Sequence, residues 1–409
     1  MNMSSDRQHR ARQASQGSRF PMIRDSTGPI APTGVTLLPA RRRLGLRTGG
    51  PHRPLRDAGR IGGGLDPEPY RLALCVPTSG TAGLWGASSL ACARLAVEQW
   101  NREGGVRGRE VRLHLIDASD ESDTVEDDLG ALAATTGIDA IVGMHTSSVR
   151  ERITTAGALG VPFVYTPLYE GGSLPDGVHA IGETPAMQLL PPLDWMIERW
   201  NLSRWFLAGN DYLWPRRTHA LARRRLVERG CSVVGNAFVP LGHCDHDRLI
   251  DAIRASGAQA VLLSMVGQDA IDFGRAFRDS GLAERMPRLG CAIEENGLLA
   301  MGADCSEGLF VASGYFAGLP TDRNGAFRER YWTRFGERAP VLNALGQSTW
   351  EGVTFLRGLL DGSRHPDGSV RYDSVRGTRW RSNEHKATPI YLAAAEGLGF
   401  GIVRTFSPT

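Results

Sequence analysis

Residues that could contact a small molecule follow four short apolar runs of this 409-residue chain. The runs lie at 71–77, 139–143, 260–264 and 289–292, and each is short and apolar enough to form a buried strand. The residues that follow them are Thr78, Ser79, Ser147, Val266, Gln268 and Glu294. Because ligands bind at the carboxyl ends of parallel strands, these residues could line a common cleft.

Ser147 has the position best suited to contact a carbonyl group. It lies between an apolar run and a predicted helix, so its hydroxyl and the N–H groups of the helix start could meet a carbonyl oxygen. The alternative is a plain helix N-cap. Val266 and Gln268 could close over a ligand, although a helix start explains them equally well. Glu294 opens a predicted helix beside another glutamate and needs no functional explanation.

Catalytic and metal-binding patterns are weak or absent in the sequence. It has no G-x-x-x-x-G-K-[ST] loop, no G-x-S-x-G elbow and no H-E-x-x-H pair. The run HCDHD at 243–247 resembles a metal cluster, but it falls where a helix cap is expected. Six cysteines lack C-x-x-C spacing and are expected to be buried thiols. We therefore expect no catalytic residue, metal or cofactor.

Strands and helices alternate along the body of the chain from residue 70 onward. Further strands are predicted at 110–117, 161–165, 205–209 and 232–240, and helices at 122–135, 148–159, 186–200, 216–228, 246–255, 268–280, 294–301, 321–335 and 345–360. The alternation has two series, which indicates an α/β protein with two doubly wound, Rossmann-like lobes and parallel sheets. Runs at 389–393 and 400–403 flank a glycine-bearing turn and predict a hairpin.

The first 70 residues differ in charge from the rest. They contain 12 Arg and 5 acidic residues, against 35 basic and 39 acidic residues in the remainder. Their Arg, Gly, Pro and Ser content predicts a disordered leader over 1–69. Residues 44–50 interrupt any apolar stretch after three arginines, so no export signal is expected. The alternative is an arginine arm that binds phosphates.

Several motifs resemble a known family. The run at 96–109 (AVEQWNREGGVRGR) looks like the first helix and turn of type I periplasmic-binding-protein folds. Three further runs are similar to the amide- and urea-binding branch of that fold, which includes amide sensors of aliphatic amidase operons. They are VGMHTS at 142–147, YTPLYEG at 165–171 and GNDYLWPR at 209–216.

The resemblance implies a two-lobed protein with a hinge that the chain crosses three times. The N-terminal lobe would comprise residues 70–184 and 314–362. The C-terminal lobe would comprise residues 185–313 and 363–409. A ligand would be enclosed in the cleft between the two lobes.

The resemblance also implies ligand contacts. Ser147 and Tyr165 match family contacts, with a core or hinge-facing tyrosine as the alternative for the latter. His145 stands where the amide sensors have a tyrosine, and Thr166 begins a run that departs from the sensors' order. Tyr212 and Trp214 match aromatic positions of the opposite lobe; the alternative for each is plain packing. An amide or urea would need such hydroxyl groups, backbone N–H groups and aromatic walls.

The function expected from these features is non-catalytic binding of a short-chain amide, urea or similar neutral polar ligand by a cytoplasmic sensor and negative regulator. Its implied partner is an antiterminator-like regulator, with a homodimer left open. The main alternative is the substrate-binding subunit of an ABC-type importer with its permease complex, periplasmic or at the cell surface. An amide-processing enzyme is a third alternative, without an activated nucleophile. We expect neither direct nucleic-acid binding nor membrane insertion.

Overall fold

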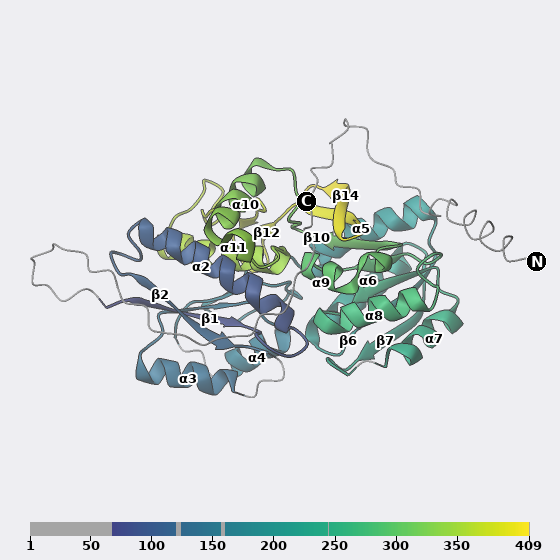
Figure 1. Cartoon of the computed structure of the whole chain (residues 1–409), viewed down its shortest axis with the longest axis horizontal. Helices are drawn as coiled ribbons and strands as arrows, with labels where there is room; N and C mark the ends of the chain where they lie inside the picture. Colours follow the sequence, from purple (N-terminus) through teal and green to yellow (C-terminus); the bar gives the residue numbers. More distant parts are fainter. Residues whose placement is uncertain (1–67, 120–123, 157–159, 244, 409) are drawn as a thin grey trace, which may run out of the picture.

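The computed structural model describes residues 68–119, 124–156, 160–243 and 245–408 (Figure 1). These residues form two α/β lobes that lie side by side, which confirms the predicted fold class. The predicted leader at 1–69 lies outside the described residues except for its last two positions. Within the described parts of the chain, no helix is both long and apolar enough to span a bilayer.

The first lobe is built on a five-stranded parallel sheet in the order β2-β1-β3-β4-β5. Its strands are β1 (Tyr70–Val76), β2 (Val111–Asp117), β3 (Ala140–Gly143), β4 (Phe163–Tyr165) and β5 (Val178–Ala180). One face is covered by α2 (Gly86–Arg102) and α11 (Ala344–Leu360), with α10 (Asp322–Phe335) beyond them. The other face is covered by α3 (Val125–Thr135) and α4 (Ser147–Thr155).

The second lobe contains a seven-stranded sheet in the order β14-β13-β10-β9-β8-β6-β7. Its strands are β6 (Arg204–Asn210), β7 (Ser232–Val239), β8 (Ala260–Ser264), β9 (Arg288–Gly290), β10 (Leu309–Ser313), β13 (Ile390–Glu396) and β14 (Gly399–Phe406). Its helices are α5 (Pro185–Trp200), α6 (Leu213–Glu228), α7 (His246–Ser256), α8 (Gly267–Asp279) and α9 (Glu295–Met301). The strands from β10 to β7 are parallel, whereas β13 and β14 form the predicted antiparallel hairpin.

Burial on both faces explains the apolar strands. All five residues of β8 are buried, as are six of the seven in β1, because helices cover both sides of each parallel sheet. Helix termini follow local chemistry: Thr184 and Asp245 cap α5 and α7 by accepting backbone N–H bonds. The five described cysteines are buried and unpaired, as expected from their spacing.

Some predicted boundaries were wrong. From residue type alone Ser88 or Ser89 could cap a helix, but α2 begins at Gly86, so both serines lie inside it and are buried. Strands β5 and β10 were not predicted; β5 has only three residues, and β10 follows closely on a turn. Tertiary packing decided these positions, where the local sequence signal is short.

The segment before β13 packs on the first lobe. The Trp380 indole and the Lys386 ammonium each donate to the Ala180 carbonyl at 3.0 Å, and the Tyr372 hydroxyl donates to Glu351 at 3.2 Å. This segment also carries a two-stranded sheet of β11 (Arg379–Trp380) and β12 (Lys386–Ala387). On these contacts we propose a third crossing just before β13, instead of a lobe boundary between residues 362 and 363.

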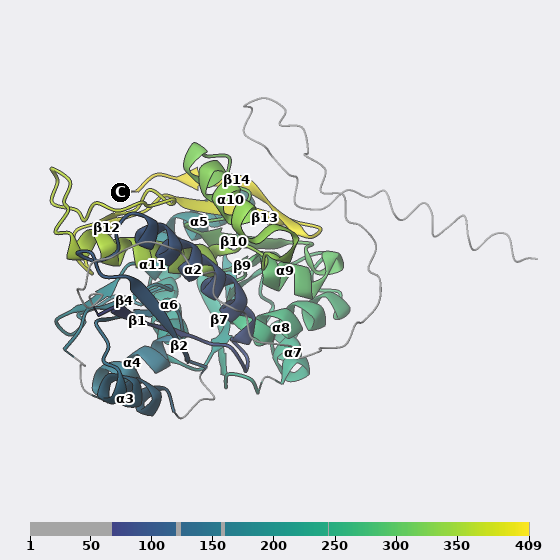
Figure 2. The ribbon, with the colours of Figure 1, turned by 60° about the vertical axis from the view of Figure 1, so that its left-hand side comes forward.

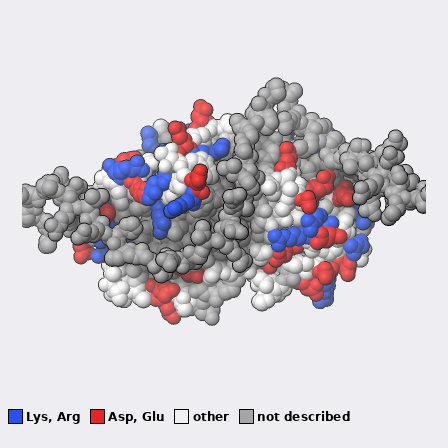
Figure 3. Space-filling view, viewed as in Figure 1, with Lys and Arg blue, Asp and Glu red and all other residues white. Residues whose placement is uncertain are grey.

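Acidic and basic side chains are interspersed on the face of the molecule in Figure 3. Several pair between helices of the first lobe: Arg334 on α10 contacts Glu98 on α2 at 2.6 Å, and Arg357 on α11 contacts Glu103 at the end of α2. Exposed pairs of this kind contribute about 0–1 kcal/mol each. The described residues on this face therefore form no continuous basic surface.

Candidate functional site

A small pocket lies between the two lobes, at the carboxyl ends of strands from both sheets. We call it the aromatic pocket; its lining residues are Trp85, His145, Thr146, Ser147, Tyr165, Pro167, Leu168, Tyr212, Trp214, Val266, Ala292, Glu294 and Leu345. Seven of the predicted contacts are therefore brought together, from segments far apart in the sequence. The cavity volume is about 30 Å³, room for about two water molecules. A larger ligand would require the lobes or side chains to move.

Ser147 joins the lobes across this pocket. It is the first residue of α4, and its Oγ accepts a hydrogen bond from the backbone N–H of Trp214 at 3.2 Å. Thr146, not Ser147, is the N-cap residue. Because the first N–H groups of a helix have no partner within it, this end of α4 suits an oxygen acceptor.

The tyrosine and histidine at the floor of the pocket are partly occupied by internal contacts. The Tyr165 hydroxyl donates to the His145 carbonyl at 3.0 Å, and the Arg150 guanidinium lies 4.9 Å from the ring centre. His145 Nδ1 contacts the Thr146 carbonyl at 3.0 Å, which requires Nδ1 to carry the proton. Burial lowers the pKa of His145 to about 4, so the ring is neutral at pH 7.

The His145 ring is turned away from an easy ligand contact. A Cβ placed on Gly143 would lie 2.5 Å from Nε2, so this nitrogen faces the β3 backbone. Nε2 is buried and has no hydrogen-bond partner among the described residues. His145 thus lines the pocket, but mainly with the rest of its ring.

Two indole N–H groups line the pocket. Trp85 and Trp214 are only 4% and 3% exposed; the Trp214 Nε1 has no hydrogen-bond partner among the described residues, whereas the Trp85 indole interacts with the Glu294 carboxyl. An unmade hydrogen bond of a buried donor costs about 1–3 kcal/mol. Tyr212 is half-buried at the start of α6 and completes the aromatic wall. The Trp214 indole N–H is therefore free to donate a hydrogen bond to an acceptor on a ligand.

Glu294 contributes the pocket's one carboxyl group. It immediately precedes α9 and is 6% exposed. Burial, followed by the charge of Glu295, raises the pKa of Glu294 to about 8. Burial likewise raises the pKa of Glu295 to about 7, against its hydrogen bond from the Ala317 N–H at 2.6 Å. Glu294 can therefore be protonated near neutral pH and could serve a ligand as donor or acceptor.

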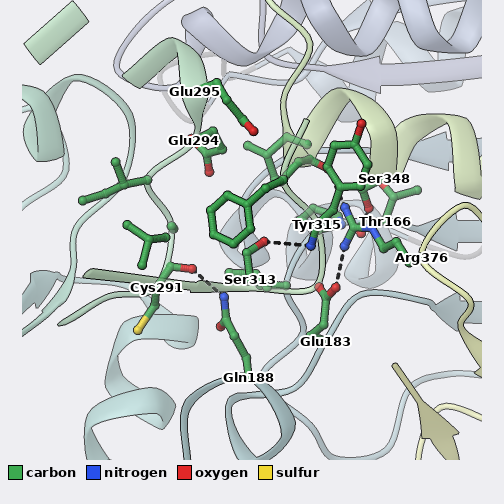
Figure 4. Close-up of a pocket in the computed structure, with 18 residues that line it drawn as sticks. Thr166, Glu183, Gln188, Cys291, Glu294, Glu295, Ser313, Tyr315, Ser348 and Arg376 are labelled. Atoms are coloured by element: carbon green, nitrogen blue, oxygen red, sulfur yellow. Dashed lines mark hydrogen bonds and ion pairs between the residues drawn. The ribbon is translucent and has the colours of Figure 1, made fainter. Parts of the chain in front are cut away.

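A second pocket adjoins the first near the hinge crossings (Figure 4). This hinge pocket is lined by Thr166, Pro167, Leu168, Glu183, Gln188, Cys291, Ala292, Ile293, Glu294, Glu295, Val311, Ser313, Tyr315, Phe316, Ala344, Leu345, Ser348 and Arg376. In Figure 4 the carboxyl groups of Glu294 and Glu295 lie on one side and the Glu183–Arg376 pair on the other. The two pockets share Pro167, Leu168, Ala292, Glu294 and Leu345.

Most polar groups of the hinge pocket have partners. Arg376 donates to Glu183 at 2.5 Å and to Gln347 at 2.5 Å, and both ends of the ion pair are buried. The backbone at Gly314 lies close to the Glu183 carboxylate: a Cβ at this position would come within 1.8 Å of Oε1. Thr166, predicted as a ligand contact, donates its hydroxyl to the Gly143 carbonyl at 3.2 Å. Thr166 therefore lines the hinge pocket and not the aromatic pocket.

Three other predicted contacts lie outside both pockets. The Thr78 N–H donates to Asp117 at 2.8 Å, and the Ser79 hydroxyl donates to the same carboxylate at 3.0 Å. Gln268 contacts Asp272 through its amide at 2.9 Å and lines a separate cavity with His243 and His246. These side chains are engaged with neighbours in their own lobes.

No metal-binding group emerges from the described residues. Three or more His, Cys, Asp or Glu side chains nowhere come close enough together in them to hold an ion. Cys244, from the suspected 243–247 cluster, lies outside the described residues.

Trp85 and Leu345 are among the lining residues of the aromatic pocket that were not predicted from sequence. Trp85 ends a 3-10 turn before α2, and Leu345 lies in the first turn of α11, which enters from a distant part of the chain. Trp85 carried one usable signal, since it belongs to the loop after the first strand. Leu345 carried none, because it reads as one apolar residue of an amphipathic helix.

Comparison with known proteins identifies the architecture. A family model described as periplasmic binding protein matches residues 69–396. A periplasmic binding protein from Burkholderia mallei has a TM-score of 0.70 and 16% identity over 83% of this chain and 95% of its own. An ABC transporter solute-binding protein from R. palustris, in complex with 4-hydroxybenzoate, has a TM-score of 0.70 and 16% identity over 84% and 97%. An ABC transporter substrate-binding protein from Sphaerobacter thermophilus has a TM-score of 0.66 and 20% identity over 83% and 98%.

These matches correct one expectation and leave another as a prediction. The predicted cytoplasmic location is wrong, because the matching family is that of periplasmic binding proteins and the similar structures include periplasmic and ABC-transporter proteins. The family model and the similar structures named above do not single out the amide- and urea-binding branch, which stays a prediction. The family consists of ligand-binding proteins rather than enzymes. With about four fifths of its length matched, the chain belongs to the periplasmic-binding-protein family.

Proposed function

We propose that this protein is the extracytoplasmic solute-binding component of an ABC-type importer. In this role it binds one small ligand in the aromatic pocket and presents it to a permease complex. Support comes from the family match and from similar structures that are ABC transporter solute-binding proteins. This role was the alternative expected from sequence, and it now takes precedence over the regulatory one.

The observation that carries the proposal is a set of buried hydrogen-bonding groups that line one aromatic-walled space between the lobes. They are the Trp214 indole N–H, which is unpaired within the described residues, the Ser147 hydroxyl at the start of α4, and the Glu294 carboxyl with the Trp85 indole. Buried polar groups are normally paired, so a ligand that accepts from Trp214 is the best explanation of its free donor.

The arrangement favours a small ligand with a carbonyl oxygen at one end and an N–H group at the other. The α4 end and Ser147 suit the oxygen, and Glu294 can accept from the N–H group. A short-chain amide or urea is the simplest compound of this kind, and the small cavity of about 30 Å³ favours it over a bulky one. Small amino acids share both features.

Aromatic acids form the competing ligand class. Similar structures were solved with 4-hydroxybenzoate, benzoate and 3,4-dihydroxybenzoic acid. A benzoate would place its carboxylate at the α4 end and its ring between Tyr212 and Trp214, but would need a wider cleft. A regulator partner and a homodimer gain no support from the family match.

Calorimetric titration tests the proposal with acetamide, propionamide, urea, alanine, valine and benzoate, followed by cell fractionation. We expect saturable one-to-one binding of an amide, urea or small amino acid, and protein outside the cytoplasmic membrane. Binding of benzoate alone would preserve the importer role but contradict the ligand class. A folded protein that binds none of them, or one retained in the cytoplasm, would contradict the proposal.

A further inference from the structure

The loop between β1 and α2 connects the two lobes. This loop, Thr78 to Trp85, leaves the first sheet and ends in the 3-10 turn η2 (Gly83–Trp85). Figure 2 shows the adjoining end of α2 beside α8 and α9 of the second lobe. The loop also supplies Trp85 to the aromatic pocket. A single segment thus contributes to the ligand cavity and to the contact between lobes.

The start of this loop is fixed to its own lobe. Asp117, at the end of β2, accepts hydrogen bonds from the Thr78 N–H, the Ser79 hydroxyl and the Ser119 N–H at 2.8, 3.0 and 3.2 Å. Several short bonds to one carboxylate hold a loop in one arrangement. Thr78 and Ser79, predicted as ligand contacts, hold the start of the loop in this structure.

The far end of the loop is bonded to the other lobe at two points. The Thr81 carbonyl accepts from the Gln268 backbone N–H at 2.9 Å, and the Leu84 carbonyl accepts from Asn296 Nδ2 at 2.9 Å. Gln268 is the second residue of α8, so its N–H has no acceptor inside the helix. The loop thereby supplies the acceptor that the helix itself lacks.

Gly267 makes this approach sterically feasible. A Cβ at this position would lie 2.2 Å from the Thr81 carbonyl oxygen and 3.0 Å from its carbon. Because the obstacle is backbone of the other lobe, a side chain could be accommodated only by moving the lobes apart. Gly267 also has φ of +57°, which glycine adopts more readily than other residues.

We propose that residues 78–85 form an interlobe latch that docks on the starts of α8 and α9, and that Gly267 is the positioning residue that permits docking. Closing the latch brings Trp85 toward Glu294 and completes the aromatic pocket. The inference rests on the proposed function only in that closure retains a ligand; the docking contact itself is independent of what the ligand is.

A matched pair of variants separates the cross-lobe clash from backbone strain. Gly281, just beyond the other end of α8, has φ of +71° and nothing within 4 Å of its hypothetical Cβ. Gly267→Ala and Gly281→Ala therefore introduce a similar backbone strain, and only Gly267→Ala pushes against Thr81. Asn296→Ala is a second, milder variant that removes the bond to Leu84 without altering a glycine.

Hydrogen exchange at the Gln268 backbone amide measures how often its bond to the Thr81 carbonyl opens. Calorimetry measures the effect of the latch on ligand affinity. In Gly267→Ala we expect at least tenfold faster exchange at Gln268, normal exchange in the middle of α8, and at least tenfold weaker ligand binding. Gly281→Ala should match wild type in both, and Asn296→Ala should weaken binding severalfold.

Unchanged exchange and affinity in Gly267→Ala would overturn the latch. So would equal losses in Gly281→Ala, because strain alone would then explain them. If Gly267→Ala unfolds, wild-type exchange and affinity in Asn296→Ala would overturn it. If wild type binds none of the ligands tested, faster Gln268 exchange in Gly267→Ala would still support the latch while the proposed function fails.

Discussion

The aromatic pocket and the hinge pocket share a wall but differ in how far their polar groups are hydrogen-bonded within the protein. In the hinge pocket the guanidinium of the buried Arg376 donates to Glu183 and Gln347, its backbone N–H donates to Glu351, and the Thr166 hydroxyl donates to the Gly143 carbonyl of β3. In the aromatic pocket the Trp214 indole N–H has no partner among the described residues. Most polar groups of the hinge pocket are thus paired within the protein, whereas we propose that a ligand pairs the free donor of the aromatic pocket.

This difference separates residues that hold the lobes from residues that serve a ligand. Burial alone does not distinguish them, since Arg376, Trp85 and Trp214 are all buried. An unpaired donor does so only where it also lines a cavity: within the described chain the indole N–H groups of Trp205 and Trp350 are unpaired too, but of these three only Trp214 lines the aromatic pocket. Four substitutions test the distinction, in order of expected effect.

The largest effect is expected for Arg376→Ala. Removing the guanidinium leaves Glu183 buried without its ion-pair partner, whereas the bond from the residue 376 backbone N–H to Glu351 remains; breaking a buried pair costs about 3–5 kcal/mol. Urea unfolding should show this loss in the free energy of unfolding. Arg381→Ala, which removes a mostly exposed arginine 3.8 Å from Asp367, should cost less than about 1 kcal/mol. Equal losses in the two variants would contradict the assigned role of Arg376.

Glu294→Gln should change the pH dependence of stability. The folded protein holds the Glu294 proton up to a pKa of about 8, whereas an ordinary glutamate releases it near 4.5. Between these values the folded state binds more protons, so wild-type stability should fall as pH rises from 4.5 to 8. The variant should lose less stability over this range, although Glu295 still contributes. Urea unfolding at pH 5, 6.5 and 8 measures this, and Glu284→Gln serves as the exposed control. Parallel profiles for wild type and Glu294→Gln would show that Glu294 is not protonated as described.

Ser147→Ala should weaken ligand binding by roughly three- to tenfold. The variant removes the hydroxyl at the α4 end and leaves the Trp214 N–H without its acceptor, and a hydrogen bond contributes about 0.5–1.5 kcal/mol. Ser148→Ala, one residue further along α4, is the control for helix effects and should bind normally. Calorimetry decides between them; equal affinities in wild type and Ser147→Ala would remove Ser147 from the site.

The smallest effect on binding is expected for Thr166→Val. Its hydroxyl serves the Gly143 carbonyl, so the variant should lose about 0.5–1.5 kcal/mol of stability and keep the wild-type affinity. Thermal unfolding and calorimetry measure the two quantities separately. A loss of affinity similar to that of Ser147→Ala would show that the hinge pocket also contacts the ligand.

Much of the fold could be predicted because apolar runs and helix periodicity are local signals. β8 was placed at its observed bounds, and the helices α5, α7 and α8 within about one residue. The placement of Ser147 and Glu294 in one cleft followed from a general property of parallel sheets, whose strand ends share one edge, whereas that of Tyr212 and Trp214 was implied by the family resemblance. That these residues bind a ligand stays a prediction.

What could not be predicted depends on contacts between distant segments. Asp117, at the end of the neighbouring strand β2, accepts hydrogen bonds from Thr78 and Ser79, and no local sequence pattern indicates this contact. The first-lobe packing of Trp380 and Lys386 depends on Ala180, some 200 residues away. The location was wrong for a different reason: it relied on a leader whose role the local sequence does not define.

The central claim is that the aromatic pocket between the lobes binds a small ligand. Calorimetry on wild type and Ala292→Leu tests it most directly, because Ala292 lines both pockets and a leucine would fill the shared wall. We expect one-to-one binding of an amide, urea or small amino acid to wild type and at least tenfold weaker binding to a folded Ala292→Leu. Equal affinity in both proteins would contradict it, since the ligand would then bind elsewhere.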